Sequence, residues 1–145
     1  MSVKPIPEGY HTLTPYLSVK DARAFINFAK KALGAEEIYC TNSEDGKVMH
    51  AEIKIGDSMM MVSETGEKNP ATICNFYLYV PDTDASYKKA IDAGAVSTME
   101  PSDQFYGDRT AGVKDSFGLN WWFGTHVEDV SPEEMEKRMK EQGKK

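Results

Sequence analysis

A pattern that recurs about sixty residues further along the chain most constrains its fold. Residues 16–21 read Tyr-Leu-Ser-Val-Lys-Asp and precede an alanine-rich stretch that ends in Leu-Gly-Ala. Residues 77–82 read Tyr-Leu-Tyr-Val-Pro-Asp and precede a second stretch that ends in Ala-Gly-Ala. A strand–helix–strands unit that occurs twice predicts two copies of one half-domain that share a core. Folds of this kind usually place their active site between the halves.

Chain length agrees with this interpretation. At 145 residues the sequence suits one compact domain, and each repeat alone is too small to bury a convincing core. We therefore expect a single domain over residues 1–145, with modules at about residues 10–64 and 72–126. The polar stretch between them contains Gly66 and Pro70, which are typical of a linker.

Hydrophobic periodicity predicts a β-α-β-β-β order in each module. Asp21 can cap the first helix, which should stop at Gly34; Asp82 or Asp84 can cap the second, which should stop at Gly94. A C-terminal helix is predicted over about residues 132–141, with Ser131 as its N-cap. The fold class is α+β, with a curved mixed sheet around a cleft. The predicted strands cover residues 12–19, 36–41, 47–55 and 58–63, then 72–80, 96–99, 109–113 and 119–124.

Charge and hydropathy exclude two classes of partner. The formal net charge is −6, whereas nonspecific nucleic-acid binding needs a clustered basic face. No stretch approaches the roughly 18 apolar residues that a membrane-spanning helix needs, and the N-terminus has no signal-type apolar region. We expect a cytoplasmic protein that binds neither nucleic acid nor membranes.

Three runs near the C-terminus carry a family resemblance. They read Phe-Tyr-Gly-Asp-Arg at 105–109, Asp-Ser-Phe-Gly-Leu-Asn-Trp at 115–121 and Gly-Thr-His-Val-Glu-Asp-Val-Ser-Pro-Glu-Glu at 124–134. A fourth, His-Ala-Glu-Ile-Lys-Ile-Gly-Asp-Ser, begins at residue 50. Together they resemble the PhnB-like proteins of the vicinal-oxygen-chelate superfamily, which includes glyoxalases, bleomycin-resistance proteins and dioxygenases. This chain departs from their usual pattern at Ser116, Leu119 and Gly124, where proline, histidine and alanine are common.

The resemblance also bears on metal binding. In the metalloenzymes of this superfamily the ligands come from the first strand of each module and from the last strand. Those positions align with Thr14, Asn75 and Trp122 in this chain. None of these residues offers the imidazole or carboxylate that catalytic cations need. We therefore predict no metal and no cofactor.

Two polar groups are candidates for direct roles. His50 should face the same side of its strand as Glu52, where it would act as a general base or contact a ligand. The alternative is a hydrogen-bonded histidine on a half-buried sheet. Arg109 could hold an anionic ligand in a bidentate clamp. The alternative is a structural arginine that bonds loop carbonyls or Asp115.

Aromatic residues complete the predicted site. Asn75, Tyr77 and Trp122 should line the cleft together with Thr14, and ordinary core packing is the alternative for the aromatic runs. His126 is more simply explained as a structural contact to the terminal helix.

These observations lead to a hypothesis of function. We expect metal-free binding of a small, partly apolar or anionic molecule in the cleft between the modules of a homodimer. One alternative is a glyoxalase- or dioxygenase-type enzyme, a lyase or oxygenase that uses an unrecognised metal site or no metal. Another is a dimeric scaffold without a ligand.

Overall fold

The computed structural model describes residues 3–143 of the chain. The chain divides into two compact units, residues 1–73 and 74–145. The division falls just beyond the polar stretch that contains Gly66 and Pro70. We describe each unit separately.

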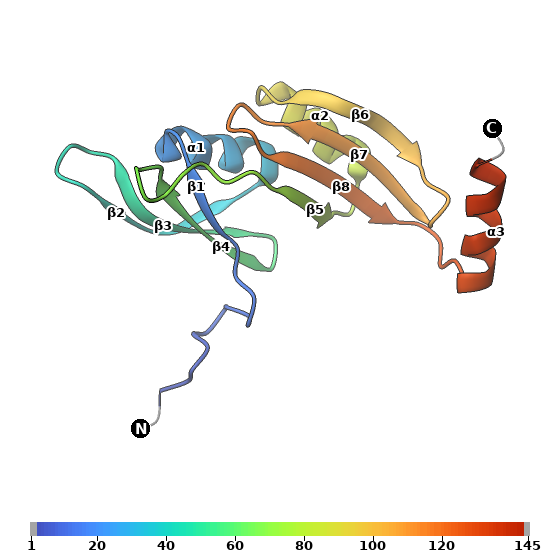
Figure 1. Cartoon of the computed structure of the whole chain (residues 1–145), viewed down its shortest axis with the longest axis horizontal. Helices are drawn as coiled ribbons and strands as arrows, with labels where there is room; N and C mark the ends of the chain where they lie inside the picture. The colour runs from blue at the N-terminus through green and yellow to red at the C-terminus, as the bar shows by residue number, and fades with distance from the viewer. Residues whose placement is uncertain (1–2, 144–145) are drawn as a thin grey trace. The chain divides into compact units, whose positions relative to one another are not determined.

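The first unit has the predicted β-α-β-β-β order (Figure 1). Its four strands form one sheet in the order β1-β4-β3-β2. Strand β1 runs parallel to β4, and the other neighbours are antiparallel. Its elements are β1 (Tyr16–Val19), α1 (Ala22–Leu33), β2 (Glu36–Asn42), β3 (Val48–Ile55) and β4 (Ser58–Glu64).

The second unit repeats this topology and adds a terminal helix. Its sheet has the order β5-β8-β7-β6, again with one parallel pair, β5 and β8. The two mixed sheets and three helices confirm the α+β class and the tandem modules. The elements are β5 (Asn75–Tyr79), α2 (Thr83–Asp92), β6 (Val96–Asp103), β7 (Asp108–Lys114), β8 (Asn120–His126) and α3 (Pro132–Gln142).

The predicted ends of α1 are confirmed, whereas α2 ends at Asp92 with Ala93 as its C-cap, just before the predicted Gly94. Asp21 caps α1 by accepting a hydrogen bond from the Ala24 amide, and Gly34 ends this helix with a φ of 66°. Asp82 rather than Asp84 caps α2. A carboxylate at the N-cap satisfies amides that would otherwise have no partner inside the helix.

Three strands differ from the prediction by three residues or more, and each lies at the edge of a sheet. Strand β5 begins at Asn75 instead of residue 72. Strand β1 begins at Tyr16 instead of residue 12, directly after Pro15. Strand β6 continues to Asp103, through a segment that the sequence predicted as a loop because it contains Pro101. Its pairing with β7 shifts register twice, and an edge strand with such irregularities tolerates proline.

Alternation along the strands gives each sheet one face against its helix. In the first unit this face buries Leu17, Ile53 and Val62 against α1, and in the second it buries Trp121 and Phe123. Figure 1 shows α1 and α2 each lying on one side of a sheet. We call the opposite side of each sheet its helix-free face. Side chains that alternate with the buried ones emerge there.

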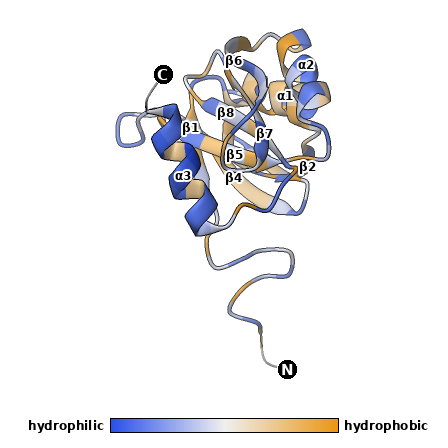
Figure 2. Cartoon of the chain, turned by 90° about the vertical axis from the view of Figure 1, so that its right-hand side faces the viewer, coloured by the Kyte–Doolittle hydropathy of each residue, from blue (hydrophilic) through white to orange (hydrophobic). Residues whose placement is uncertain are grey.

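Helix α3 makes polar contacts with its own unit. Ser131 caps it, as predicted, by accepting a hydrogen bond from the Glu134 amide at 3.1 Å. None of its residues is buried, and Figure 2 colours most of the helix hydrophilic. Arg138 attaches it through a 3.0 Å hydrogen bond to the Phe105 carbonyl and an ion pair with Glu128.

Among residues 3–143, no helix is both long enough and apolar enough to cross a membrane.

Candidate functional site

Three of the predicted ligand-binding residues meet on the helix-free face of the second sheet. Tyr77 on β5 lies directly opposite Trp122 on β8, and Asn75 is two residues earlier on the same strand. The Trp122 indole nitrogen donates to the Asn75 side-chain oxygen at 3.4 Å. Tyr79 extends the aromatic row, with its ring centroid 5.1 Å from that of Tyr77. The expected alternation along β5 and β8 is therefore confirmed.

Two glycines let these aromatic rings lie flat on the sheet. A Cβ on Gly112 would stand 2.7 Å from the six-membered ring of Trp122. A Cβ on Gly124 would stand 2.3 Å from the Tyr77 hydroxyl oxygen. Both distances are far below van der Waals contact, so any larger residue would displace the ring. Glycine is typical of strand positions where another group approaches the backbone closely.

A chain of hydrogen bonds runs from Tyr77 to the end of β8. The Tyr77 hydroxyl donates to Asp108 Oδ2 at 2.8 Å, and Asp108 Oδ1 lies 2.9 Å from His126 Nδ1. The other ring nitrogen of His126 lies 2.7 Å from Asp129. Thr110 Oγ1 lies 2.9 Å from the Tyr77 hydroxyl. A carboxylate can only accept, so both bonds of His126 require a doubly protonated imidazole.

The charges of this network follow from its contacts. Burial alone would raise the pKa of Asp108, but hydrogen bonds from His126 and Tyr77 lower it below its usual value. The same carboxylate, together with Asp129, raises the pKa of His126 above 6.5. Burial raises the pKa of Tyr77, so its hydroxyl is neutral. We conclude that the network holds the Tyr77 ring in place.

Arg109, expected from the sequence to clamp an anionic ligand in the cleft, does not join this group. Its guanidinium lies on the helix side of the sheet, where it bonds Asp84 of α2 at 2.8 and 3.1 Å. It also pairs with Asp103 of β6 at 3.1 Å. The structural alternative for Arg109 is therefore supported, with different partners. Asp115 instead accepts from the Trp121 indole and holds the β7–β8 turn.

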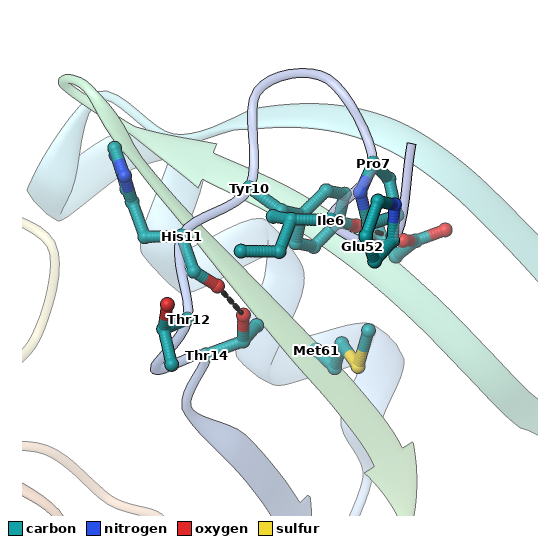
Figure 3. Close-up of a pocket in the computed structure, with 9 residues that line it drawn as sticks. Ile6, Pro7, Tyr10, His11, Thr12, Thr14, Glu52 and Met61 are labelled. Carbon is teal, nitrogen blue, oxygen red and sulfur yellow. Dashed lines mark hydrogen bonds between the residues drawn. The ribbon is translucent and has the colours of Figure 1, made fainter. Parts of the chain in front are cut away.

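The remaining predicted residues lie on the helix-free side of the first unit. His50 and Glu52 share a side of β3, as expected, with His50 Nε2 3.9 Å from Glu52 Oε2. Thr14 precedes β1 and donates to the His11 carbonyl at 3.3 Å. Both Thr14 and Glu52 line a cavity of about 360 Å³ (Figure 3). The other lining residues are Pro5, Ile6, Pro7, Tyr10, His11, Thr12 and Met61.

The positions that align with metal ligands do not fit a cation. The Thr14 hydroxyl is engaged with a backbone carbonyl, and Asn75 and Trp122 bond each other. Across residues 3–143, no three His, Cys, Asp or Glu side chains are grouped so that they could hold a metal ion.

The sequence alone missed several residues that build these sites. Asp108 and His126 are both in the runs that carry the family resemblance, but they are far apart in sequence and their contact was not anticipated. The glycines under the rings gave a weak signal, since glycine inside a strand often marks a close approach. No sequence signal pointed to Tyr10, because the segment around it has no periodic pattern.

Two tandem βαβββ modules, each with a helix-free face, define the class of protein. Residues 10–123 match the model of the Glyoxalase/Bleomycin resistance protein/Dioxygenase superfamily. The chain belongs to this superfamily.

Relatives and solved structures agree with this assignment. The chain is 33% identical to the uncharacterized protein Mb0911c of Mycobacterium bovis, over 90% of this chain and 93% of that protein. The structure of TioX from Micromonospora sp. ML1 aligns with a TM-score of 0.71 at 23% identity, over 81% of this chain and 99% of that one. TnmS3, an antibiotic binding protein from Streptomyces sp. CB03234, aligns with a TM-score of 0.66 at 16% identity, over 86% of this chain and 100% of that one. At these identities the two structures show a common fold.

Proposed function

We propose that this protein binds a small, flat, partly aromatic molecule without a metal, and that the helix-free face of the second sheet provides the contact surface. The observation that carries the proposal is the row of aromatic side chains formed by Tyr77, Tyr79 and Trp122. Tyr77 is 40% exposed, Tyr79 is 70% exposed, and Trp122 is partly exposed. Exposed aromatic groups of this size favour stacking against an apolar ligand. The antibiotic-binding function of TnmS3, a protein of the same fold, is consistent with this proposal.

The polar groups beside the rings favour a ligand that carries a hydrogen-bond acceptor. Asn75 is exposed, its side-chain oxygen is taken by Trp122, and its amide N–H groups have no partner within the described residues. A carbonyl or ether oxygen at the edge of a flat ligand would satisfy them. Arg109, which the sequence suggested as the partner of an anion, points to the other side of the sheet and pairs with Asp84 there.

We further infer that the chain follows the PhnB-like branch and forms a homodimer whose modules complete a cleft. Helix α3 leaves Met139 55% exposed, which supports a contact with a second subunit. Light scattering should then give about twice the chain mass of 16.2 kDa. A monomer at micromolar concentration would exclude the dimer but not the aromatic contact surface.

The binding proposal is tested with flat carbonyl compounds such as coumarin and flavone. We expect amide resonances of residues 75–79 and 120–124 to shift on titration, with or without a chelator. Trp122→Ala should weaken binding roughly two- to tenfold, as the loss of one aromatic contact predicts. Tyr87→Ala removes a half-buried aromatic residue from α2 and should leave the affinity unchanged. Binding that requires an added divalent metal, or that leaves these resonances unmoved, would contradict the proposal.

A further inference from the structure

A second site lies in the first unit, beneath the segment that precedes β1. Residues 5–14 form one wall of the cavity of about 360 Å³, and Glu52 of β3 and Met61 of β4 form the opposite wall (Figure 3). Ligand pockets for small molecules usually begin at about 300 Å³. All of its lining residues belong to the unit of residues 1–73, and none belongs to the aromatic face of the second unit.

Few contacts hold the wall that the N-terminal segment provides. The Tyr10 hydroxyl donates to Glu52 Oε1, and the Tyr10 amide bonds the Pro7 carbonyl at 3.0 Å. Further along, Thr14 donates to the His11 carbonyl. Figure 3 shows Tyr10, Ile6 and Pro7 gathered near Glu52, with the His11 ring on the far side of the segment. The carboxylate is thus the anchor that brings the segment onto the sheet.

Glu52 also gives the cavity its charge. Its side chain is only 22% exposed, and it is the acidic side chain of the cavity wall. Oε1 accepts from Tyr10, whereas Oε2 lies 3.9 Å from His50 Nε2, beyond hydrogen-bond range. No hydrogen bond reaches Oε2 from residues 3–143. A largely buried carboxylate with a free oxygen favours a cationic partner.

The hydroxyl oxygens of Tyr10 and Thr14 offer further acceptors in the cavity. The hydroxyl protons of Tyr10 and Thr14 are engaged with Glu52 and with His11, which leaves lone pairs on both oxygens. Ile6, Pro7 and Met61 supply apolar surface around them. From this combination we infer that the cavity binds a small primary or secondary amine with an apolar body. The ammonium group bonds Glu52, and the body contacts the apolar wall.

Three probes of nearly equal size and different charge test this inference. We would titrate 2-phenylethylamine, 2-phenylethanol and phenylacetate into the full chain and follow amide resonances. The amine should shift residues 5–14 and the strand positions around Glu52 and Met61. It should bind at least about tenfold more tightly than the alcohol, because a hydrogen bond between two charged groups is stronger than one to a neutral hydroxyl. Phenylacetate should bind more weakly than either.

A matched pair of variants assigns the preference to one carboxylate. Glu52→Gln should abolish the tenfold preference for the amine over the alcohol. Glu44→Gln makes the same charge change on an exposed turn of this unit and should leave the preference intact. If Glu52→Gln fails to fold, the comparison of the three probes on the wild-type protein still tests whether the cavity prefers an amine. Equal binding of amine and alcohol, an unchanged preference in Glu52→Gln, or shifts confined to residues 74–143 would overturn the inference.

Discussion

The ring of Tyr77 occupies the space above Gly124 that a side chain on the neighbouring strand would fill. A Cβ at Gly124 would stand 2.3 to 2.6 Å from three atoms of Tyr77. The ring cannot simply move away, because Asp108 and Thr110 both bond its hydroxyl. The aromatic face of the second unit therefore depends on the absence of a side chain at this position.

Gly124→Ala should destabilise the protein by about 1–3 kcal/mol, the usual cost of an added methyl group in a tightly packed place. Chemical denaturation measures this change. Gly66→Ala is the matched control, since nothing lies within 4 Å of its Cβ position and its φ is not positive, and it should change stability by less than about 0.5 kcal/mol.

A double-mutant cycle identifies the cause of that loss. Tyr77→Ala removes the ring, so adding Gly124→Ala to it should cost much less than Gly124→Ala costs alone. Full additivity of the two changes would contradict the proposed contact between the ring and the glycine.

Most of the fold could be predicted from the sequence because its signals are local. Asp21 and Gly34 mark the two ends of α1, and alternation of apolar residues marks the strands. Strand β6 could not be predicted beyond residue 99, because Pro101 normally excludes a strand. Only the edge position and shifted register of β6, which depend on its neighbour, make the proline acceptable.

The candidate site could be predicted only where the alternation of side chains along a strand fixes the face on which each residue lies. Alternation places Asn75, Tyr77 and Trp122 on one face, as the structure confirms, because β5 and β8 pair without a register shift. Arg109 was placed on the wrong face, although Ala111 and Val113, two and four residues later, are buried against the helix side. Counting in steps of two from these apolar residues would have placed Arg109 with them.

Contacts distant in sequence could not be predicted at all. Tyr10 reaches Glu52 across 42 residues, and His126 reaches Asp108 across 18. Such pairings follow from the tertiary arrangement of strands, which periodicity does not encode.

The pH dependence of stability should reveal the doubly protonated state of His126. Its pKa is raised in the folded protein, so its stabilising contribution is present below the unfolded value of 6.5 and is lost as pH rises through the higher folded value. Thermal melts of wild type and His126→Gln should therefore differ most below pH 6.5. The difference should shrink above the folded pKa.

At acidic pH, the dependence of stability on pH reflects the protonation of Asp108. Its folded pKa lies below 3.8, so its contribution is present above pH 3.8 and is lost as pH falls through the folded value. His11→Gln, which replaces an exposed histidine, should leave both limbs of the profile unchanged. A constant difference between wild type and His126→Gln from pH 5 to 9 would contradict the assigned protonation state.

Arg109→Ala should lower the melting temperature and leave ligand affinity unchanged. The guanidinium bonds Asp84 on α2 and Asp103 on β6, so its loss leaves two carboxylates facing each other without their shared partner. Lys88→Ala breaks a more exposed pair with Asp92 and should have a smaller effect on the melting temperature. If folded Arg109→Ala binds coumarin more weakly and keeps the wild-type melting temperature, the prediction is wrong and Arg109 contributes to ligand binding.

Helix α3 should detach locally when Arg138 is replaced. This side chain joins the helix to the Phe105 carbonyl and to Glu128, while no residue of the helix is buried. A second connection lies at Gly107, whose carbonyl accepts the amides of Val127 and Glu128 and whose Cβ position is blocked by the Glu128 carbonyl at 2.1 Å. That connection holds the segment before the helix but not the helix itself.

Arg138→Gln should therefore accelerate amide hydrogen exchange in residues 132–142, because a helix of this length is marginal without tertiary contacts. Exchange in β7 and β8 should stay at the wild-type rate, since Gly107 still holds the chain that follows them. Lys140→Gln, which removes only an exposed pair with Glu136 on the same helix, serves as the control and should change little. Slow exchange in α3 of Arg138→Gln would contradict the anchoring role of Arg138. It would mean that another contact holds the helix, either the half-buried Met135 or Met139 against a second subunit.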